Sequence, residues 1–321
     1  IESKLAPVEE LPTVRILPTV PGRDADDLVE EDKHTRTQSI AVFYSTSRFL
    51  SRLPPALPKK KTIENAMAYS NSLDQLEISL NDFSNWYRVL TEAEDGKRSQ
   101  RIFQQLESAV YTFIQDVLGL QLHASRPPRF SVKKNGDTFF LEQLSDGERG
   151  LLALVFDLTR RLAIANPESD NPIAEGAALV LIDEIELHLH PKWQRQVVRK
   201  LQEVFKNCQF IITTHSPQVI GQIKAEKLRL LSHDASGKVV LDLVTQTFGM
   251  DSSWILENIM GVPARDYKTE QQLSNVYNQI DAGDYKVARI KAEELRAEIG
   301  DFPDLQEAIA LLDRFELLGH E

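Results

Sequence analysis

The stretch Leu179-Val180-Leu181-Ile182-Asp183-Glu184 decides the fold of this chain, because four apolar residues run directly into two carboxylates. A continuous apolar run of this kind predicts a fully buried strand of a parallel sheet. Such sheets place ligands at the carboxyl ends of their strands, where Asp183 and Glu184 would emerge. The first carboxylate can serve Mg²⁺ or its bound waters, and the second can orient and deprotonate an attacking water. A strand that ends in Asp-Glu is also common by chance.

A second buried strand with polar residues at its end is predicted at 209–213, where Thr214-His215-Ser216-Pro217 follows. Further strands and helices are predicted at 38–44, 146–165, 178–182 and 191–205. Strands that alternate with helices indicate an α/β fold with a mixed, mostly parallel sheet. A lone histidine at a strand end is usually structural, but His215 lies in line with the carboxylates at one predicted sheet edge.

A third polar group lies in Leu144-Ser145-Asp146-Gly147-Glu148-Arg149-Gly150, directly before an apolar helix. A serine and a glycine at a helix start present a hydroxyl and free backbone N–H groups at the positive end of the helix dipole, which favours a phosphate. The same residues also fit an ordinary capping box, in which Ser145 pairs with Glu148 three residues later. The three groups together, rather than any one of them, indicate a common site.

The rest of the chain adds helices to this α/β core. Apolar and aromatic residues at helical spacing predict an insert at 74–118, with Gly119 ending its second helix. Asn135-Gly136 predicts a hairpin of strands 130–132 and 138–141, and a strand pair is expected at 228–232 and 239–245. We therefore expect an N-terminal lobe with the insert over 1–143, a lobe with the three polar groups over 144–250, and a helical module over 251–321.

Three motifs resemble those of ABC-class ATPases of the SMC and RecF type. LSDGERG resembles their signature motif, LVLIDEIELHLHPKWQRQ resembles Walker B with the D-loop, and FIITTHSPQVI resembles the His switch. More narrowly, the chain resembles the PtuA-type ATPases of Septu and retron-associated anti-phage defence systems. The narrower resemblance includes AVFYSTSR, DFSNWYRVL and TFGMDSSWILENIMGVPARD. It implies a P-loop NTPase fold, an ABC-ATPase head, with ATP and Mg²⁺ as cofactors.

The resemblance also implies roles for the residues at the predicted sheet edge. Asp183 would support Mg²⁺, Glu184 would be the general base, and His215 would contact the γ-phosphate. His190 would lie in the D-loop that crosses the seam of a dimer. His188 and His190 could alternatively form a metal-binding His-x-His pair.

The signature residues would act on the opposite protomer. By resemblance, Ser145 and Gly147, with Asp146 and Glu148 beside them, would bind the γ-phosphate of a nucleotide that the other subunit holds. Asp146 departs from the family pattern, because many ABC proteins have a glycine there. A carboxylate beside a phosphate is unfavourable unless it points outward or caps the helix, so γ-phosphate binding could be weaker or differently gated.

The sequence contains no G-x-x-x-x-G-K-[ST] motif, so the cradle for the β-phosphate and the hydroxyl ligand of Mg²⁺ are not found in it. Gly96-Lys97 is followed by Arg98 and has no glycine at the required upstream position. The family places this loop before the point at which the sequence begins. We therefore expect the intact gene product to carry the loop upstream of Ile1, and hydrolysis by this chain alone is left open.

Composition is that of an ordinary globular protein, with 42% hydrophobic and 26% charged residues. The net charge of −11 argues against wholesale wrapping of nucleic acid, although basic patches at 59–61 and 126–134 leave a local DNA contact open. The single cysteine, Cys208, excludes an internal disulfide. No apolar run approaches the roughly 18 residues that span a bilayer, so we expect a bacterial cytoplasmic protein without a membrane partner.

The resemblance implies an ATP hydrolase, the ATPase subunit of a bacterial anti-phage defence complex. Head-to-tail dimers would bind and hydrolyse ATP at their interfaces and regulate a partner HNH-type nuclease, since this chain shows no nuclease constellation. DNA contact would come through the complex, and the acidic helical end is a candidate docking surface. The alternative is a RecF- or SMC-like DNA-repair ATPase without a dedicated nuclease. A transporter subunit fits poorly, and a scaffold with little turnover is left open.

Overall fold

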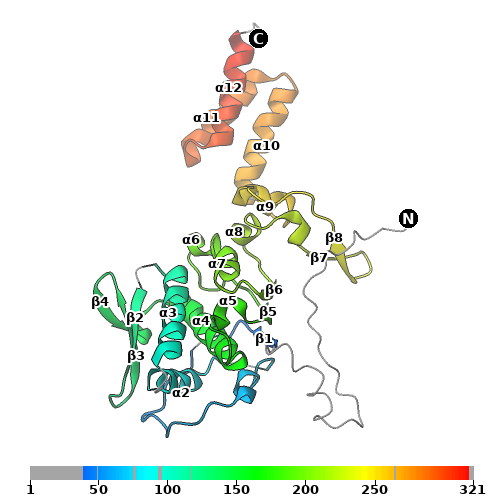
Figure 1. The fold of residues 1–321 in the computed structure, drawn as a ribbon. Helices are drawn as coiled ribbons and strands as arrows, with labels where there is room; N and C mark the ends of the chain where they lie inside the picture. The colour runs from blue at the N-terminus through cyan, green and yellow to red at the C-terminus, as the bar shows by residue number, and fades with distance from the viewer. Residues whose placement is uncertain are drawn as a thin grey trace. The chain divides into compact units, whose positions relative to one another are not determined.

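This computed structural model describes residues 39–48, 50–74, 77–92, 96–115, 117–263 and 265–317. The chain forms two compact units, one that ends at Val219 and one that begins at Ile220 (Figure 1). Gln38, the first residue of the predicted first strand, lies outside the described residues, as does the start of the predicted N-terminal lobe. The three-part division of the chain stays a prediction.

The first unit is built on a parallel sheet of three strands, β1 (Ile40–Tyr44), β5 (Ala178–Ile182) and β6 (Cys208–Ile212), in the order β1-β5-β6. Their registers are aligned, because Tyr44 pairs with Ile182 and Ile182 pairs with Ile212. The carboxyl ends of all three strands therefore meet at one edge of the sheet. This confirms the predicted α/β fold and the parallel arrangement of its central strands.

The helix α4 (Asp146–Ala165) is the core of this unit, because residues all around its circumference are buried. It packs against β1, α2 (Leu80–Thr91) and α3 (Gly96–Phe113), as Figure 1 shows. Phe83 of α2 stacks on Phe156 of α4 with ring centroids 4.4 Å apart. The predicted insert is therefore a pair of amphipathic helices that cover α4.

An antiparallel sheet of β2 (Val117–His123), β3 (Arg129–Lys134) and β4 (Asp137–Phe140) completes the predicted hairpin and adds a strand to it. The prediction that Gly119 ends a helix is wrong, because α3 ends at Phe113 and Gly119 lies inside β2. Gly119 has φ +63° at a register shift in the β2–β3 ladder. A glycine with positive φ serves a bulge as well as a helix end, which explains the error.

Shorter elements complete the first unit. The single helix predicted at 191–205 is two helices, α6 (Pro191–Gln194) and α7 (Val197–Val204). The other short elements are η1 (Asn65–Ala68), η2 (Leu141–Gln143) and α5 (Pro172–Glu175), and α8 (Pro217–Ile220) runs across the boundary between the two units.

The second unit contains an antiparallel hairpin and helices. Its elements are η3 (Ala225–Lys227), β7 (Leu230–His233), β8 (Val239–Asp242), α9 (Ser252–Asn258), α10 (Tyr267–Asp281), α11 (Tyr285–Ile299) and α12 (Pro303–Leu317). The last three helices share an apolar core of their own, with Val276, Ala292 and Leu305 fully buried. This confirms the predicted helical end of the chain. Among the helices that the structure describes, none has the length and apolar character needed to cross a membrane.

Candidate active site

The two carboxylates that follow β5 are held between the ends of its neighbouring strands. The backbone N–H of Asp183 donates to the carbonyl of Tyr44 at 2.9 Å, and the N–H of Thr213 donates to the carbonyl of Ile182 at 2.9 Å. The ladders of the sheet thus extend beyond the last residues of the strands. Asp183 is therefore fixed at the predicted position, at the carboxyl edge of the sheet.

Thr213 connects both carboxylate residues to the end of β6. Its hydroxyl donates to Oδ1 of Asp183 and accepts from the backbone N–H of Glu184 at 2.9 Å. Glu184 has φ +45°, a left-handed conformation that is uncommon for residues other than glycine. Such backbone outliers gather at functional sites, where the surrounding structure holds them in place. The conformation of Glu184 is thus set by contacts on both sides.

Arg48 holds the same turn from the β1 side. Its guanidinium donates to the carbonyls of Asp183 and Glu184 at 2.6 Å each, and to that of Ser45 at 3.3 Å. Burial lowers the pKa of Arg48, against the opposing effect of the nearby Glu186, Asp183 and Glu184 carboxylates. The sequence reasoning assigned Arg48 no role. Its only signal was an arginine close after a buried strand.

Glu186 fixes the residues that follow β6. The Thr214 hydroxyl donates to Oε2 of Glu186 at 2.7 Å, and the backbone N–H of His215 donates to Oε1 of the same carboxylate at 2.5 Å. His215 itself is exposed, whereas Asp183 and Glu184 are half-buried. The structure thus brings Asp183, Glu184 and His215 to one sheet edge. Glu186, which the sequence reasoning did not single out, ties the two strand ends together.

The segment before α4 forms the capping box that the sequence allowed. The Ser145 hydroxyl accepts from the N–H of Glu148 at 3.4 Å and donates to its Oε2 at 2.8 Å, and the Ser145 N–H donates to that oxygen at 3.0 Å. Burial opposes ionisation of Glu148, but hydrogen bonds from Lys134 and Ser145 outweigh it and lower its pKa. Ser145 remains exposed at the helix start. The cap therefore engages the hydroxyl within the subunit, while Ser145 itself stays at the surface.

Asp146, the departure from the family pattern, is exposed and forms an ion pair with Arg149 in the same helix turn. The arginine partly neutralises the carboxylate. A negative charge in the first turn also interacts favourably with the positive end of the helix dipole. Asp146 is therefore an outward-facing residue of the helix start.

Gly147 brings the start of α4 against the segment after β5. A Cβ at this position would lie 2.5 Å from the carbonyl oxygen of His188, which has φ +60°. An open hollow there is lined by Ser145, Glu148 and His190, among others. His190 is exposed, and its Nδ1 accepts from the N–H of Lys192 at 3.2 Å to cap α6. Thus the predicted residues form two groups, one at the sheet edge and one around this hollow.

The donors at the sheet edge suit a magnesium ion. Asp183 offers a carboxylate beside the Thr213 hydroxyl, and oxygen donors are the ligands that Mg²⁺ prefers. Magnesium is usually held by one or two carboxylates together with waters and substrate phosphates, rather than by a cage of protein ligands. In the part of the chain that the structure describes, no group of three or more His, Cys, Asp or Glu residues is placed to hold a metal.

The chain matches the family described as "AAA domain, putative AbiEii toxin, Type IV TA system" over residues 29–221. The "Retron Ec83 probable ATPase" of Escherichia coli is 37% identical over 214 residues, which make up 64% of this chain and 38% of that protein. The "Septu protein PtuA" of Bacillus thuringiensis is 24% identical over 236 residues, 70% of this chain and 59% of that protein. The chain thus spans less than two thirds of the length of these relatives.

Among solved structures, the SMC head domain from Thermotoga maritima is similar to part of this chain. The alignment covers 51% of this chain and 52% of that chain, with 19% identity and a TM-score of 0.33. The family match over residues 29–221 carries the family assignment of the chain, and so partial a structural likeness adds nothing to it.

Proposed function

Because the chain belongs to the AAA-domain family described as putative AbiEii toxin of type IV toxin–antitoxin systems, we propose that it is the ATPase subunit of a bacterial anti-phage defence complex. The observation that carries the ATPase assignment is the placement of Asp183, Glu184 and His215 at one edge of the parallel sheet. Defence is supported by relatives named as a retron ATPase and a Septu protein.

In this proposal the protein binds ATP and positions water for attack on its γ-phosphate. Glu184 accepts the proton of the attacking water, and Arg48 and Thr213 hold the backbone that carries it. His215 contacts the γ-phosphate from the end of β6, held there by Glu186. Asp183 would hold Mg²⁺, which supplies positive charge to the phosphates. Most of the catalysis then comes from positioning and charge.

The direct test is the Glu184→Gln variant of the intact protein. Glutamine keeps the shape of the side chain but cannot accept the proton, so ATP turnover should fall by about 10²–10⁴-fold while nucleotide binding persists. Glu203→Gln is the matched control, because Glu203 is exposed on α7 and pairs only with Arg199 among the ion pairs described. Measurable hydrolysis that Glu184→Gln leaves unchanged would refute the general-base assignment.

We also propose that two copies share each nucleotide. Ser145 is exposed at the start of α4, where backbone N–H groups and the helix dipole favour an anion. Its hydroxyl can turn from Glu148 to the γ-phosphate of a nucleotide that a second copy holds, and His190 faces the same seam. Oligomerisation is then part of the chemistry, and ATP occupancy shifts the assembly between open and closed states.

The partner in this proposal is an HNH-type nuclease, and its docking site is the helical module at the end of the chain. Residues 261–321 contain 13 acidic and 7 basic residues and so offer an acidic surface. The core of α10 to α12 is their own, so their removal should spare the ATPase unit. Deletion after Gly261 should abolish co-purification of the nuclease while ATP binding is kept. Persistence of the complex would refute the docking role.

A further inference from the structure

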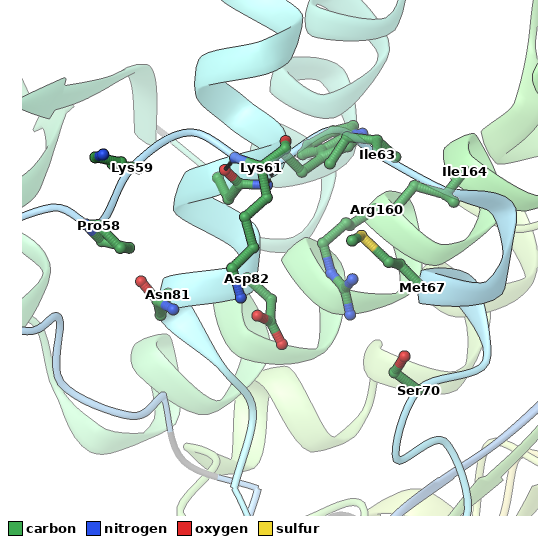
Figure 2. Close-up of a pocket in the computed structure, with 12 residues that line it drawn as sticks. Pro58, Lys59, Lys61, Ile63, Met67, Ser70, Asn81, Asp82, Arg160 and Ile164 are labelled. Carbon is green, nitrogen blue, oxygen red and sulfur yellow. Dashed lines mark hydrogen bonds between the residues drawn. The ribbon is translucent and has the colours of Figure 1, made fainter.

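A small pocket of about 170 Å³ lies beneath the proline- and lysine-rich loop that precedes η1 (Figure 2). The loop contributes Lys59 and Lys61, the first turns of α2 contribute Asn81 and Asp82, and α4 contributes Arg160. None of the residues at 183–190 or 213–215 lines it. The pocket is smaller than the roughly 300–1,000 Å³ of sites for drug-sized ligands, so it suits a compact chemical group.

The loop is fastened over the pocket by side chains of α2. Nη1 of Arg88 donates to the carbonyl of Pro58 at 3.0 Å. Asn85 binds the backbone of Lys61 twice, accepting from its N–H at 2.8 Å and donating to its carbonyl at 3.2 Å. Lys60, between the two pocket lysines, instead forms an ion pair with Glu92 at 2.9 Å. These hydrogen bonds therefore fix the backbone that carries Lys59 and Lys61 at the mouth of the pocket.

Two buried polar atoms of the pocket residues have no hydrogen-bond partner among the described residues. They are Nε of Arg160 and Oδ1 of Asn81. Arg160 is only 4% exposed, and Figure 2 shows its guanidinium extending into the pocket. Native proteins satisfy nearly all buried polar groups, so the walls of the pocket carry polar groups that the described residues do not pair. The Asn81 amide can present either its oxygen or its nitrogen.

The charges around the pocket favour an anion. Nη2 of Arg160 donates to Oδ1 of Asp157 at 2.7 Å, and Arg161 donates to the other oxygen of that carboxylate. Two arginines thus share one carboxylate. Lys59 and Lys61 add two positive charges at the mouth, and Asp82 adds one negative charge. Basic groups therefore outnumber acidic ones in and behind the pocket, which matches a doubly charged oxyanion.

We propose that this pocket binds a phosphate group, either free phosphate or the phosphate of a mononucleotide. Arg160 binds it at depth through its guanidinium, and Lys59 and Lys61 bind it from the mouth. Charge-assisted hydrogen bonds from arginine and lysine are the usual means of holding phosphate oxygens. This inference does not depend on the proposed ATPase role.

The test is calorimetric titration of inorganic phosphate into the intact protein. The Lys59→Ala/Lys61→Ala variant should bind phosphate about tenfold more weakly, since it removes the two exposed positive charges at the mouth of the pocket. Lys60→Ala is the matched control and should bind as the wild type does. Both lysines are exposed, so these variants spare the core.

Asp82→Asn should have the opposite effect and tighten phosphate binding several-fold, because it removes the one carboxylate among these pocket residues. AMP that binds more tightly than phosphate would identify a mononucleotide site, and equal binding would identify a site for the free ion. The proposal is overturned if the wild type shows no phosphate binding, or if the double lysine variant binds as well as Lys60→Ala does.

Discussion

At the scale of single residues, Gly147 shows how one position serves two purposes. The family resemblance gives it a phosphate-facing role in the signature motif. In the structure its missing side chain also lets the start of α4 approach the carbonyl of His188, which a Cβ would meet at 2.5 Å. A rigid backbone atom cannot give way as a flexible side chain would. The glycine is therefore needed for packing within one subunit, whatever it does to a nucleotide.

Gly147→Ala should accordingly lower the free energy of unfolding by about 1–3 kcal/mol, the usual cost of overpacking a tight site. Gly150→Ala is the matched control one turn further along α4, where an added Cβ would meet nothing within 4 Å among the described residues. Alanine is the better helix former, so the control should stabilise the protein by up to about 1 kcal/mol. Urea unfolding of both variants measures the difference, and equal midpoints would contradict the packing role.

At the scale of elements, the sequence predicted the parts whose pattern is local. The strands β5 and β6 and the helix α4 lie within a residue or so of their predicted bounds, because apolar runs and a capping box mark them. The strand β2 was missed, because Gly119 reads as a helix end when its partner strand is unknown. A glycine's conformation is decided by the ladder it joins, which no local window contains.

The candidate site divides in the same way. Asp183, Glu184 and His215 come shortly after predicted strands in the sequence, so their place at the sheet edge could be predicted. Arg48 and Glu186 could not, because each acts on residues from another part of the chain. Arg48 contacts the carbonyl of a residue 135 positions away, and the Glu186 carboxylate accepts from His215, 29 positions away. Such supporting contacts depend on the assembled sheet rather than on a motif.

The elements α4, β1 and the η1 segment are joined by one buried ionic cluster. Asp157 accepts from Tyr44 at 3.1 Å and from Arg160 and Arg161 at 2.7 Å each, and Arg161 also donates to the carbonyl of Ala68 at 2.7 Å. Burial alone would raise the pKa of Asp157, but the two arginines outweigh it and lower that pKa below its ordinary 3.8. The cluster is therefore ionised at neutral pH.

Asp157→Asn should destabilise the protein by about 3–5 kcal/mol at pH 7, because two buried arginines lose their shared counter-charge. Asp146→Asn, at the exposed start of the same helix, should cost less than about 1 kcal/mol. The folded-state pKa of Asp157 is depressed, so its stabilisation is present above 3.8 and is lost as the pH falls through the folded value. Urea unfolding between pH 7 and pH 3 tests this: the gap in stability between the two variants should narrow as the pH falls below 3.8, and a constant gap would contradict the account.

At the scale of the whole molecule, the proposed chemistry extends beyond one chain. Glu184 and His215 lie at the sheet edge, whereas Ser145 lies at the hollow beside His190. In the proposed head-to-tail arrangement, the sheet edge of one copy faces the signature segment of another. Each nucleotide site is then completed by Ser145 from one subunit and Glu184 from its partner. A subunit that lacks a functional Ser145 can therefore form an active site with a subunit that lacks a functional Glu184.

The most direct measurement is ATP turnover by a mixture of two inactive variants, Ser145→Arg and Glu184→Gln, in the intact protein. Ser145 is exposed, so the arginine can be accommodated without disturbing the core. A mixed head-to-tail dimer contains one site with both native residues, so equal amounts should recover about one quarter of wild-type turnover when subunits pair at random. If the mixture stays as inactive as either variant alone, the two residues do not meet across an interface and the shared-site account is wrong.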